Sequence, residues 1–227
     1  MHRTKGDGGR DELRESVLLD DGVETGILRL EYDANRKIVQ QTEPAKFVFY
    51  LRQGRVRLSV TSQEGREAIV AILGSGDFFG EECLAGHQLR IATATAMTQC
   101  ALTRIEKKVM MGMLHEKPHL SELFLKHLLS RCIRSEADLA DQLLNSSEKR
   151  LARTLLSLSQ FSKRSRAKTI VPSISQADLA QMVGTTRSRV SHFMHKFKQR
   201  GFIDYGGGEL TVKSGLRRLV LHDRYLP

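Results

Sequence analysis

The sequence predicts an α+β protein in which a β-rich N-terminal region, a long helix and a C-terminal helix-turn-helix with a β-hairpin follow one another. Three observations predict this order. Short alternating segments separated by glycine turns extend to about residue 106, a helical period begins after Pro118, and residues 175–200 have the spacing of two helices joined at a glycine. Changes of hydrophobic period and turn residues of this kind are the main sequence signals for secondary structure.

These changes of period divide the 227 residues into four parts. Residues 1–13 are polar and rich in glycine, and we expect a disordered tail there. Residues 14–116 form the β-rich region, residues 117–145 the long helix, and residues 146–227 the helix-turn-helix region. Hydrophobic residues make up 40% of the chain, which is ordinary for a globular protein and argues against global disorder.

The β-rich region contains four informative segments. Residues 56–61 alternate between apolar and polar side chains, as a half-buried strand does. After a turn at residues 63–66, residues 68–73 are predicted to be a buried strand. Residues 91–96 and 101–105 are again strand-like. Many short strands separated by regular turns are typical of a small barrel or sandwich.

The long helix carries a pattern that resembles a coiled-coil seam. Its positions recur at alternating steps of three and four residues: Leu125, Leu128, Cys132, Ser135, Leu139 and Gln142. Two of these side chains are polar, so the seam is uneven along its length. The pattern predicts a helix that pairs with a second copy in a two-fold dimer. The alternative is a long helix that packs only against its own β-rich region.

Residues 175–200 have the spacing of a helix-turn-helix. Ser175 is a good N-cap residue, and an acidic residue follows three positions later. Gly184 then interrupts the helical pattern, because the turn between two helices favours a residue that adopts positive φ. Thr185 or Thr186 caps the second helix. The inward face of that helix is predicted from helical spacing to be Val190, Phe193 and Phe197.

The outward face of the second helix is polar. The candidate DNA-binding residues on this face and at the cap are Thr186, Arg187, Ser188, Arg189, Ser191, His192 and His195. Such side chains reach base edges or phosphates when a helix lies in the major groove of DNA. The alternative is an ordinary helical hairpin with a solvated face. Residues 202–205 and 209–212 then flank three glycines and predict a β-hairpin wing.

Charge is distributed unevenly along the chain. Residues 148–227 contain 16 Lys and Arg against 5 Asp and Glu, a net charge of +11, whereas the remaining residues contain 20 against 21. A basic loop at residues 163–168 contributes to this excess. A segregated basic domain implies a polyanionic partner. Double-stranded DNA fits better than a membrane, because no segment is a basic amphipathic helix with an aromatic apolar face.

Several classes of protein are disfavoured by what the sequence lacks. Cys83, Cys100 and Cys132 have no short spacing, so we expect buried thiols in a reducing cytoplasm, with no disulfide framework and no metal cluster. No apolar run approaches the roughly 20 residues of a membrane span, and the N-terminus does not resemble a signal peptide. Paired catalytic carboxylates, a nucleophile elbow and a P-loop are also missing, so we predict no enzyme and no catalytic residues.

Taken together, the glycine-punctuated β-rich region, the long helix and the winged helix-turn-helix resemble the cyclic-AMP receptor protein/FNR family of bacterial transcription regulators. The resemblance covers the chain from about residue 28 to its end. It is strong across residues 175–202 and at residues 76–81 (GDFFGE), which look like the family's phosphate-binding cassette, closed by Arg90 and Ala92. It implies a cyclic-nucleotide-binding-type β-roll, a dimerisation helix and a winged helix-turn-helix domain.

The resemblance also implies an effector site in the β-roll. Backbone N–H groups at Gly80 and Glu81 would cradle an anion, and Arg90 would pair with a phosphate in fork geometry. Glu81 would accept a hydrogen bond from a ribose hydroxyl, and Ser135 matches a threonine that meets the purine in the family. The scheme requires no cofactor. The expected effector is a cyclic nucleotide, either cyclic AMP or cyclic GMP.

Two residues depart from the family pattern. Ile91 stands where members that bind cyclic AMP usually have a hydroxyl side chain, and Cys83 stands where glycine is usual. The alternative is therefore a vestigial, empty roll in which Glu81 and Arg90 form an internal ion pair. DNA binding would then be independent of any ligand.

On these grounds we predict a cytoplasmic, homodimeric, sequence-specific DNA-binding transcription regulator that is gated by an effector in the β-roll. The resemblance matches Arg187 to the family's guanine-reading arginine and makes RNA polymerase an expected partner. Ser188 and His192 differ from the receptor protein, so we expect a different half-site. The other interpretation is a cyclic-nucleotide-binding regulatory module of a kinase or channel.

Overall fold

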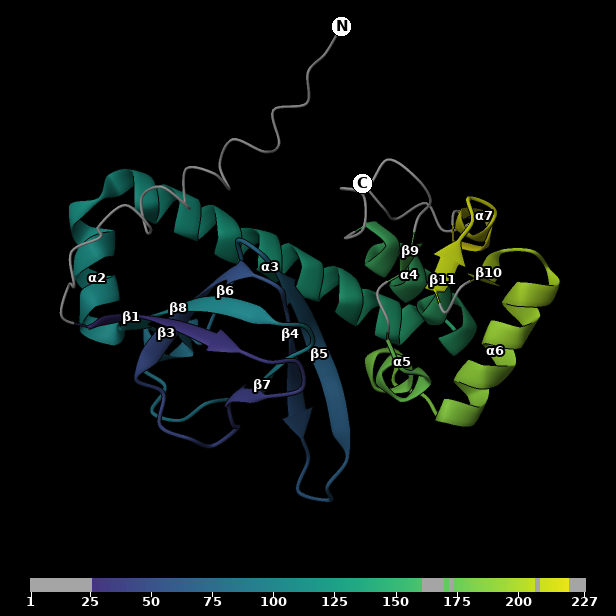
Figure 1. The fold of residues 1–227 in the computed structure, drawn as a ribbon, viewed down its shortest axis with the longest axis horizontal. Helices are drawn as coiled ribbons and strands as arrows, with labels where there is room; N and C mark the ends of the chain where they lie inside the picture. The colour runs from purple at the N-terminus through teal and green to yellow at the C-terminus, as the bar shows by residue number, and fades with distance from the viewer. Residues whose placement is uncertain (1–25, 161–169, 172–173, 207–208, 221–227) are drawn as a thin grey trace, which may run out of the picture. The chain divides into compact units, whose positions relative to one another are not determined.

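The computed structural model describes residues 26–160, 170–171, 174–206 and 209–220 of the chain. The predicted tail at residues 1–13 and the basic loop at residues 163–168 lie outside the described residues. The chain divides into two compact units, Met1–Arg134 and Ser135–Pro227 (Figure 1).

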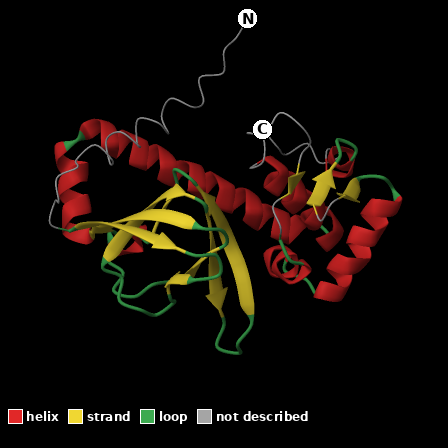
Figure 2. Cartoon of the chain, viewed as in Figure 1, coloured by secondary structure: helices red, strands yellow, loops and turns green. Residues whose placement is uncertain are grey.

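Two four-stranded antiparallel sheets form the first unit. One has the strand order β1-β8-β3-β6 and the other the order β2-β7-β4-β5. The strands are β1 (Ile27–Tyr32), β2 (Lys37–Val39), β3 (Phe47–Gln53), β4 (Arg55–Thr61), β5 (Glu67–Gly74), β6 (Phe78–Phe79), β7 (Thr93–Ala96) and β8 (Cys100–Glu106). The β-roll that the sequence predicts is therefore present (Figure 2).

Alternation along β3 gives the two faces of its sheet separate cores. Phe49 and Leu51 belong to the core between the two sheets, together with Val56 of β4. Val48 and Tyr50 belong to a second core on the outer face of the same sheet. Successive side chains of a strand point to opposite faces, so one short strand supports both cores.

Two helices cover that outer face. Helix α2 spans Lys107–Glu116 and helix α3 spans Pro118–Leu144. Met110 of α2 and Phe124 of α3 belong to the same buried cluster as Phe78 of β6. The rings of Phe78 and Phe124 meet edge to face, with centroids 5.2 Å apart. The first half of α3 is thereby fixed against the strand that leads into residue 80.

The predicted strands are present, with one correction to their environment. Strands β4 and β8 contain the predicted segments, and β7 begins later than predicted, at Thr93. The predicted buried strand at residues 68–73 forms β5, but β5 lies at the edge of its sheet. Ile69 and Leu73 are buried, whereas Val70 is 55% exposed. Successive side chains of a strand point to opposite faces, so Val70 points away from the side on which Ile69 and Leu73 are buried.

Helix α3 presents its apolar residues to two different sides. Leu128, which the sequence pattern placed in the dimer seam, packs instead against the buried cluster of its own roll. The large apolar residues that are exposed on α3 are Leu125, Leu129, Ile133, Leu139, Leu143 and Leu144. Four of these residues, Leu125, Leu129, Leu139 and Leu143, keep heptad spacing, with Leu129 in place of Leu128 and Leu143 in place of Gln142, whereas Ile133 and Leu144 fall outside it. Leu128 is therefore corrected from a seam residue to a contact of the roll, and the pairing of α3 with a second copy stays a prediction.

Helices and a small sheet form the second unit. Its elements are α4 (Ser147–Gln160), β9 (Ile170–Val171), α5 (Gln176–Val183), α6 (Arg187–Gln199), β10 (Ile203–Gly206), β11 (Glu209–Val212) and α7 (Leu216–Val220). The predicted β-hairpin is confirmed as the antiparallel pair β10 and β11, and β9 adds a third strand. Leu155 of α4, Leu179 of α5 and Phe197 of α6 are buried in its core.

The helix-turn-helix is set by its capping residues. The Ser175 hydroxyl accepts a hydrogen bond at 3.0 Å from the backbone N–H three residues on and caps α5. Gly184 ends α5 with φ 67° and ψ 49°, in the left-handed region that the sequence predicts. Thr186, and not Thr185, caps α6, because its hydroxyl accepts from the backbone N–H three residues on at 3.3 Å.

The inward face of α6 differs from the prediction at one position. Val190 and Phe197 are buried as predicted, but Met194 occupies the position expected for Phe193. Phe193 is half-buried, and its ring lies beside that of His192 with centroids 5.8 Å apart. Positions three and four residues after Val190 both satisfy helical spacing, so tertiary packing decides between them.

Candidate effector pocket and DNA-binding surface

A cavity of about 480 Å³ lies within the first unit. Its wall is mostly apolar and includes Val39, Leu58, Val60, Leu84, Ile91 and Phe124. Four charged residues also line it: Glu81, Glu82, Arg90 and Arg131. A cavity of this size with an apolar wall and a few polar groups is the usual form of a small-molecule site.

Gly80 shapes one end of this pocket. It follows β6 and precedes a short 3₁₀ helix, η1 (Glu81–Cys83). Its φ of 81° lies in the left-handed region, and a Cβ at this position would lie 2.5 Å from Arg90 Nη1. The backbone conformation and the close approach of the guanidinium both require glycine here. The structure therefore brings the predicted residues Gly80 and Arg90 into direct contact.

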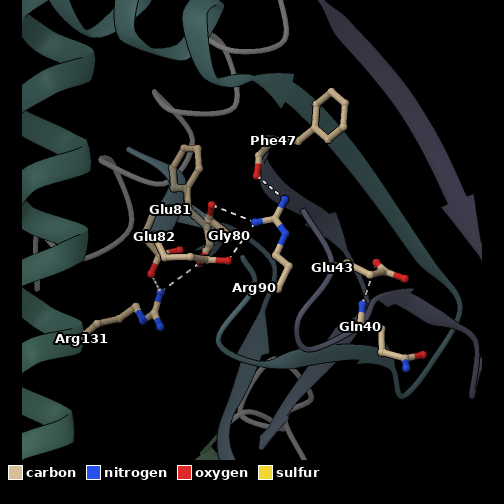
Figure 3. A network of polar contacts seen from close by, with 9 residues as sticks. Gln40, Glu43, Phe47, Gly80, Glu81, Glu82, Arg90 and Arg131 are labelled. Carbon is tan, nitrogen blue, oxygen red and sulfur yellow. Dashed lines mark hydrogen bonds and ion pairs between the residues drawn. The ribbon is translucent and has the colours of Figure 1, made fainter. Parts of the chain in front are cut away.

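Arg90 is buried next to this turn, and three protein acceptors hold its guanidinium (Figure 3). Nη1 donates to the Gly80 carbonyl at 3.0 Å and to Glu82 Oε1 at 2.9 Å. Nη2 donates to the Phe47 carbonyl at 2.7 Å. Arg90 is 3% exposed, and its guanidinium lies 5.5 Å from the centroid of the Phe49 ring. The charge of Arg90 is therefore balanced within the roll, by Glu82.

Glu81 pairs with a different arginine. Its Oε1 accepts a hydrogen bond from Nη1 of Arg131 on α3. Burial raises the pKa of Glu81, and the positive charge of Arg131 opposes part of that shift. The sequence-based alternative, an ion pair between Glu81 and Arg90, is corrected to two pairs, Glu82–Arg90 and Glu81–Arg131. Neighbouring side chains of the short helix η1 leave in different directions, so Glu82 reaches Arg90 in the loop before β7 and Glu81 reaches Arg131 on α3.

His127 of α3 contacts the strand that leads into this turn. Its Nε2 accepts a hydrogen bond from the Phe78 backbone N–H at 3.3 Å, and its Nδ1 lies 3.7 Å from Asp77 Oδ1. Burial lowers the pKa of His127, Asp77 opposes this shift, and the positive charges of Arg131 and Arg134 add to it. A neutral imidazole with its proton on Nδ1 fits these contacts, because Nε2 is an acceptor.

The other predicted pocket residue, Ser135, does not line this cavity. It is exposed on α3 and falls in the second unit. Glu82 and Arg131, by contrast, line the cavity although the sequence analysis did not single them out. A signal for Glu82 was available, since two adjacent acidic residues precede an arginine eight positions on. Arg131 is 50 residues away from its partner Glu81, and no local pattern indicates that contact.

The candidate DNA-binding residues lie on α6 and at its N-cap. All of them are exposed: Thr186, Arg187, Ser188, Arg189, Ser191, His192 and His195. The Thr186 hydroxyl serves as the helix cap. His195 Nε2 lies 3.0 Å from the Gln199 side-chain amide one turn further along. Arg187 and Ser188 stand in the first turn of α6, which is the part of a recognition helix that meets base edges.

Contacts from α4 hold the two helices in place. Lys196 of α6 places its Nζ 2.8 Å from the carboxylate of Glu148 at the start of α4. Arg150 of α4 donates from Nε to the Val183 carbonyl at the end of α5 at 3.0 Å, and from Nη1 to the Asn145 carbonyl at 2.8 Å. A cation is favourable at such carbonyls, because the C-terminal end of a helix carries partial negative charge. Helices α5 and α6 are therefore each anchored to α4.

Further expectations concern metals, membranes and thiols. Within the described ranges, no group of three or more His, Cys, Asp and Glu residues is placed to hold a metal ion. No helix in the part of the chain that the structure describes is long and apolar enough to cross a membrane. Cys83 and Cys100 are buried as predicted, whereas Cys132 is exposed on α3. The prediction of a buried thiol was therefore wrong for Cys132.

Comparison with protein-family models matches two segments of the chain. Residues 29–117 match the cyclic nucleotide-binding domain, and residues 149–219 match the Crp-like helix-turn-helix domain. The chain belongs to the cyclic-AMP receptor protein/FNR family. It is a DNA-binding transcription regulator with an effector-binding domain. The two matched segments contain the pocket and the recognition helix, respectively.

The relatives that this chain matches are named as transcription regulators or receptor proteins, and each alignment covers most of both proteins. The chain is 25% identical over 190 residues to the CRP-like cAMP-activated global transcriptional regulator of Mycobacterium tuberculosis, which covers 83% of this chain and 85% of that protein. It is 29% identical over 184 residues to the cyclic AMP receptor protein of Thermus thermophilus, with 80% of this chain and 82% of that protein covered.

Solved structures show the same fold. A CRP-family transcriptional regulator from Thermus thermophilus aligns with a TM-score of 0.72 and 25% identity, covering 84% of this chain and 96% of that one. The c-di-GMP responsive global regulator CLP of Xanthomonas campestris aligns with a TM-score of 0.75 and 21% identity, covering 92% of this chain and 100% of that one. The latter likeness concerns the fold alone.

A cyclic nucleotide matches the pocket in part. The volume and the apolar wall suit a nucleoside. The phosphate is the part without a partner, because Arg90 and Arg131 are each paired with a carboxylate. The side chain of Ile91 lines the pocket and has no hydroxyl to donate. In this arrangement a ligand phosphate would compete with two carboxylates of the protein for these arginines.

Proposed function

We propose that this regulator acts as a homodimer that recognises a specific DNA site, and that a small molecule in the β-roll sets its affinity for that site. One observation carries the proposal: a single chain combines a partly open, mostly apolar pocket with a capped helix whose polar face is exposed. A regulatory module of a kinase or channel would have no use for the second feature. We therefore favour a DNA-binding regulator over such a module.

In the proposed complex, α6 lies in the major groove. Arg187, in its first turn, donates to the O6 and N7 edge of a guanine. Ser188, Ser191 and His192 contact neighbouring bases, while Arg189 and His195 approach phosphates. Thr186 positions the helix by capping it. The exposure of all these side chains supports this assignment.

Dimerisation is proposed along the exposed apolar face of α3. Leu129 is 55% exposed, Leu139 60% and Leu143 75%, and these residues keep heptad spacing with Leu125 and Cys132. A second copy of the chain would cover this face across a two-fold axis. Paired recognition helices would then read two half-sites of one operator.

The dimer is tested by replacing Leu129 and Leu139 together with glutamate. We expect analytical ultracentrifugation to show a monomer, because the dimer would bury four unpaired carboxylates. The roll should stay folded. Leu128→Glu is the matched control: Leu128 packs on its own roll, so this change should lower the stability of the roll and leave the seam intact. A double variant that remains dimeric would remove this face as the interface.

For the effector, cyclic AMP and cyclic GMP are the first candidates. Support comes from the match to the cyclic nucleotide-binding domain and from the cAMP-activated relatives. Gly80, Glu81 and Arg90 would hold the ligand in the roll, and Ser135 is proposed to approach its base. No cofactor is needed in this scheme.

The experiment measures affinity for an operator selected from random duplex DNA, by fluorescence anisotropy, with and without each cyclic nucleotide at millimolar concentration. We expect tight binding to the selected duplex, weak binding to a scrambled duplex, and a ligand-dependent change of affinity for the selected one. Equal affinity for both duplexes would contradict site-specific recognition. Specific binding that no ligand alters would favour the second candidate function, a ligand-independent regulator with a vestigial roll, which the Glu82–Arg90 ion pair favours.

The proposed partners are thus double-stranded DNA, a second copy of the chain and RNA polymerase, in the cytoplasm. Regulation without catalysis is supported by the names of the relatives, which are transcription regulators. Transcription in vitro from a promoter that carries the selected operator checks the polymerase contact. An unchanged transcript level at saturating protein would contradict it.

A further inference from the structure

The charged residues that line the pocket balance one another. Arg90 pairs with Glu82 at 2.9 Å, and Arg131 pairs with Glu81. Two cations therefore meet two carboxylates, all supplied by the chain. An anionic ligand gains little from such a lining, because each arginine already has a negative partner at contact distance.

The Glu82–Arg90 pair is the more enclosed of the two. The exposed fraction of the Arg90 side chain is 2% and that of Glu82 is 12%, compared with 25% for Arg131 and 20% for Glu81. Arg90 also donates to two backbone carbonyls, so its guanidinium cannot move toward a ligand without losing further hydrogen bonds. The third guanidinium nitrogen, Nε, is buried and has no hydrogen-bond partner among the described residues. At Nη1, a ligand phosphate would have to displace the Glu82 carboxylate.

We propose that Glu82 is the specificity-determining residue of the pocket: its carboxylate occupies the anion position at Arg90 and selects an uncharged ligand over its phosphate-bearing counterpart. The inference rests on the proposed effector function of the same cavity. It explains how a roll of suitable volume can have an apolar wall and a glycine turn and yet disfavour a phosphate. A cyclic nucleotide in this cavity of about 480 Å³ would then be held mainly by its nucleoside part, because Glu82 lowers the contribution of its phosphate.

The test is a change of ligand preference, measured by calorimetric titration of the full-length protein with cyclic AMP and with adenosine. In the wild type we expect cyclic AMP to bind no more tightly than adenosine. In Glu82→Gln, Arg90 keeps a hydrogen-bond acceptor but loses its counter-charge. We expect the affinity for cyclic AMP to rise by about tenfold or more, since hydrogen bonds to a charged group are among the stronger ones. The affinity for adenosine should change by less than about twofold.

Two further variants make the result decisive. Glu82→Leu also removes the carboxylate and should raise the affinity for cyclic AMP in the same way. It serves as the test variant if Glu82→Gln folds poorly. Glu64→Gln is the matched control, because Glu64 carries the same charge, is exposed and pairs with Arg66 outside the pocket. It should leave both affinities unchanged.

The proposal is overturned if the wild type prefers cyclic AMP to adenosine, or if cyclic AMP binds no more tightly to the Glu82 variants than to the wild type, the case of no binding at all included. DNA binding is measured in parallel on the same preparations. If selection from random duplex DNA yields no duplex that the protein binds, the proposed regulatory function is refuted. A chain that binds DNA but shows no gain for cyclic AMP in the Glu82 variants refutes the role of Glu82 alone.

Discussion

The pocket and the recognition helix use arginine in opposite ways. Arg90 is 3% exposed and donates to three acceptors, one of which is a carboxylate. Arg187 is exposed in the first turn of α6. A buried charge is tolerated only with a partner and hydrogen bonds, whereas an exposed charge is solvated by water. The first arginine therefore supports the fold, and the second is available to an outside ligand.

A family motif thus predicts the position of a side chain better than it predicts the contacts of that side chain. The resemblance predicted a ligand contact for both arginines, and the structure shows that one of them is buried and the other exposed. In the pocket, however, the counter-ion comes from Glu82, inside the cassette itself. A ligand that approaches Arg90 competes with the protein, whereas DNA that approaches Arg187 competes with water.

Removal of the buried arginine should have the strongest effect. Arg90→Met leaves the Glu82 carboxylate without its partner, so we expect the free energy of unfolding of the roll to fall by about 3–5 kcal/mol. Arg187→Met on α6 should change it by less than about 0.5 kcal/mol. Urea unfolding monitored by circular dichroism measures both. Adding Glu82→Leu to Arg90→Met should recover part of the loss, and the absence of any recovery would mean that the pair itself is not the cause.

Two glycines with positive φ, one in each region, extend the contrast to the backbone. Gly80→Ala should destabilise the protein by about 2–3 kcal/mol, because the added Cβ meets Arg90 Nη1 at 2.5 Å in addition to the left-handed strain. Gly184→Ala should cost only about 1 kcal/mol, since its nearest neighbour is a side-chain atom of Gln142 at 3.4 Å. Thermal and urea unfolding compare them. Equal losses would show that the strain of the backbone dominates and that the contact with Arg90 adds nothing.

On the recognition helix the expected effect is on DNA and not on stability. Arg187→Ala should weaken binding to the selected operator by about 1–3 kcal/mol and relax the preference at one base pair. Fluorescence anisotropy with the operator, its single-base variants and a scrambled duplex measures this. Equal weakening on operator and scrambled DNA would reduce Arg187 to a phosphate contact and leave base reading to Ser188, Ser191 and His192.

The smallest expected effect is on how the stability of the roll depends on pH, through His127 of α3. The pKa of His127 lies below 6.5, so the folded state binds fewer protons than the unfolded state, and stability is lost as pH falls below about 6.5. His127→Gln keeps an acceptor for the Phe78 N–H and removes the titration. Between pH 8 and pH 5.5 we expect the wild-type Tm to fall by about 2–4 °C more than that of the variant. The same fall in both proteins would assign the pH dependence to other groups.

The local parts of the fold could be predicted because a few adjacent residues determine them. Ser175 and Gly184 define the ends of α5 through their own side chain and backbone, and the predicted hairpin pairs residues 203–206 with residues 209–212. Where two neighbouring positions satisfy the same helical spacing, the sequence could not show which of the two side chains is buried. Met194 against Phe193 and Leu129 against Leu128 are such cases, and contacts with distant elements resolved both.

The pocket could be located from the sequence, but its electrostatics could not be derived. Gly80 and Arg90 were predicted together because the resemblance to the family assigns both of them to one cassette. The partner of each carboxylate depends on the direction in which successive side chains leave η1, and on Arg131, which α3 brings in from 50 residues away. A pattern of residue types contains neither piece of information.

The contacts of α4 have a consequence for how strongly DNA binding should respond to ionic strength. Arg150 is engaged by helix-end carbonyls, Arg153 by Asp141 and Lys196 by Glu148. These three cations belong to the 16 of residues 148–227, yet they are used to hold the domain together. Counterion release depends on cations that meet phosphates, with a slope of about 0.9 in log affinity against log salt for each contact. The slope should therefore stay well below what the net charge of this region suggests.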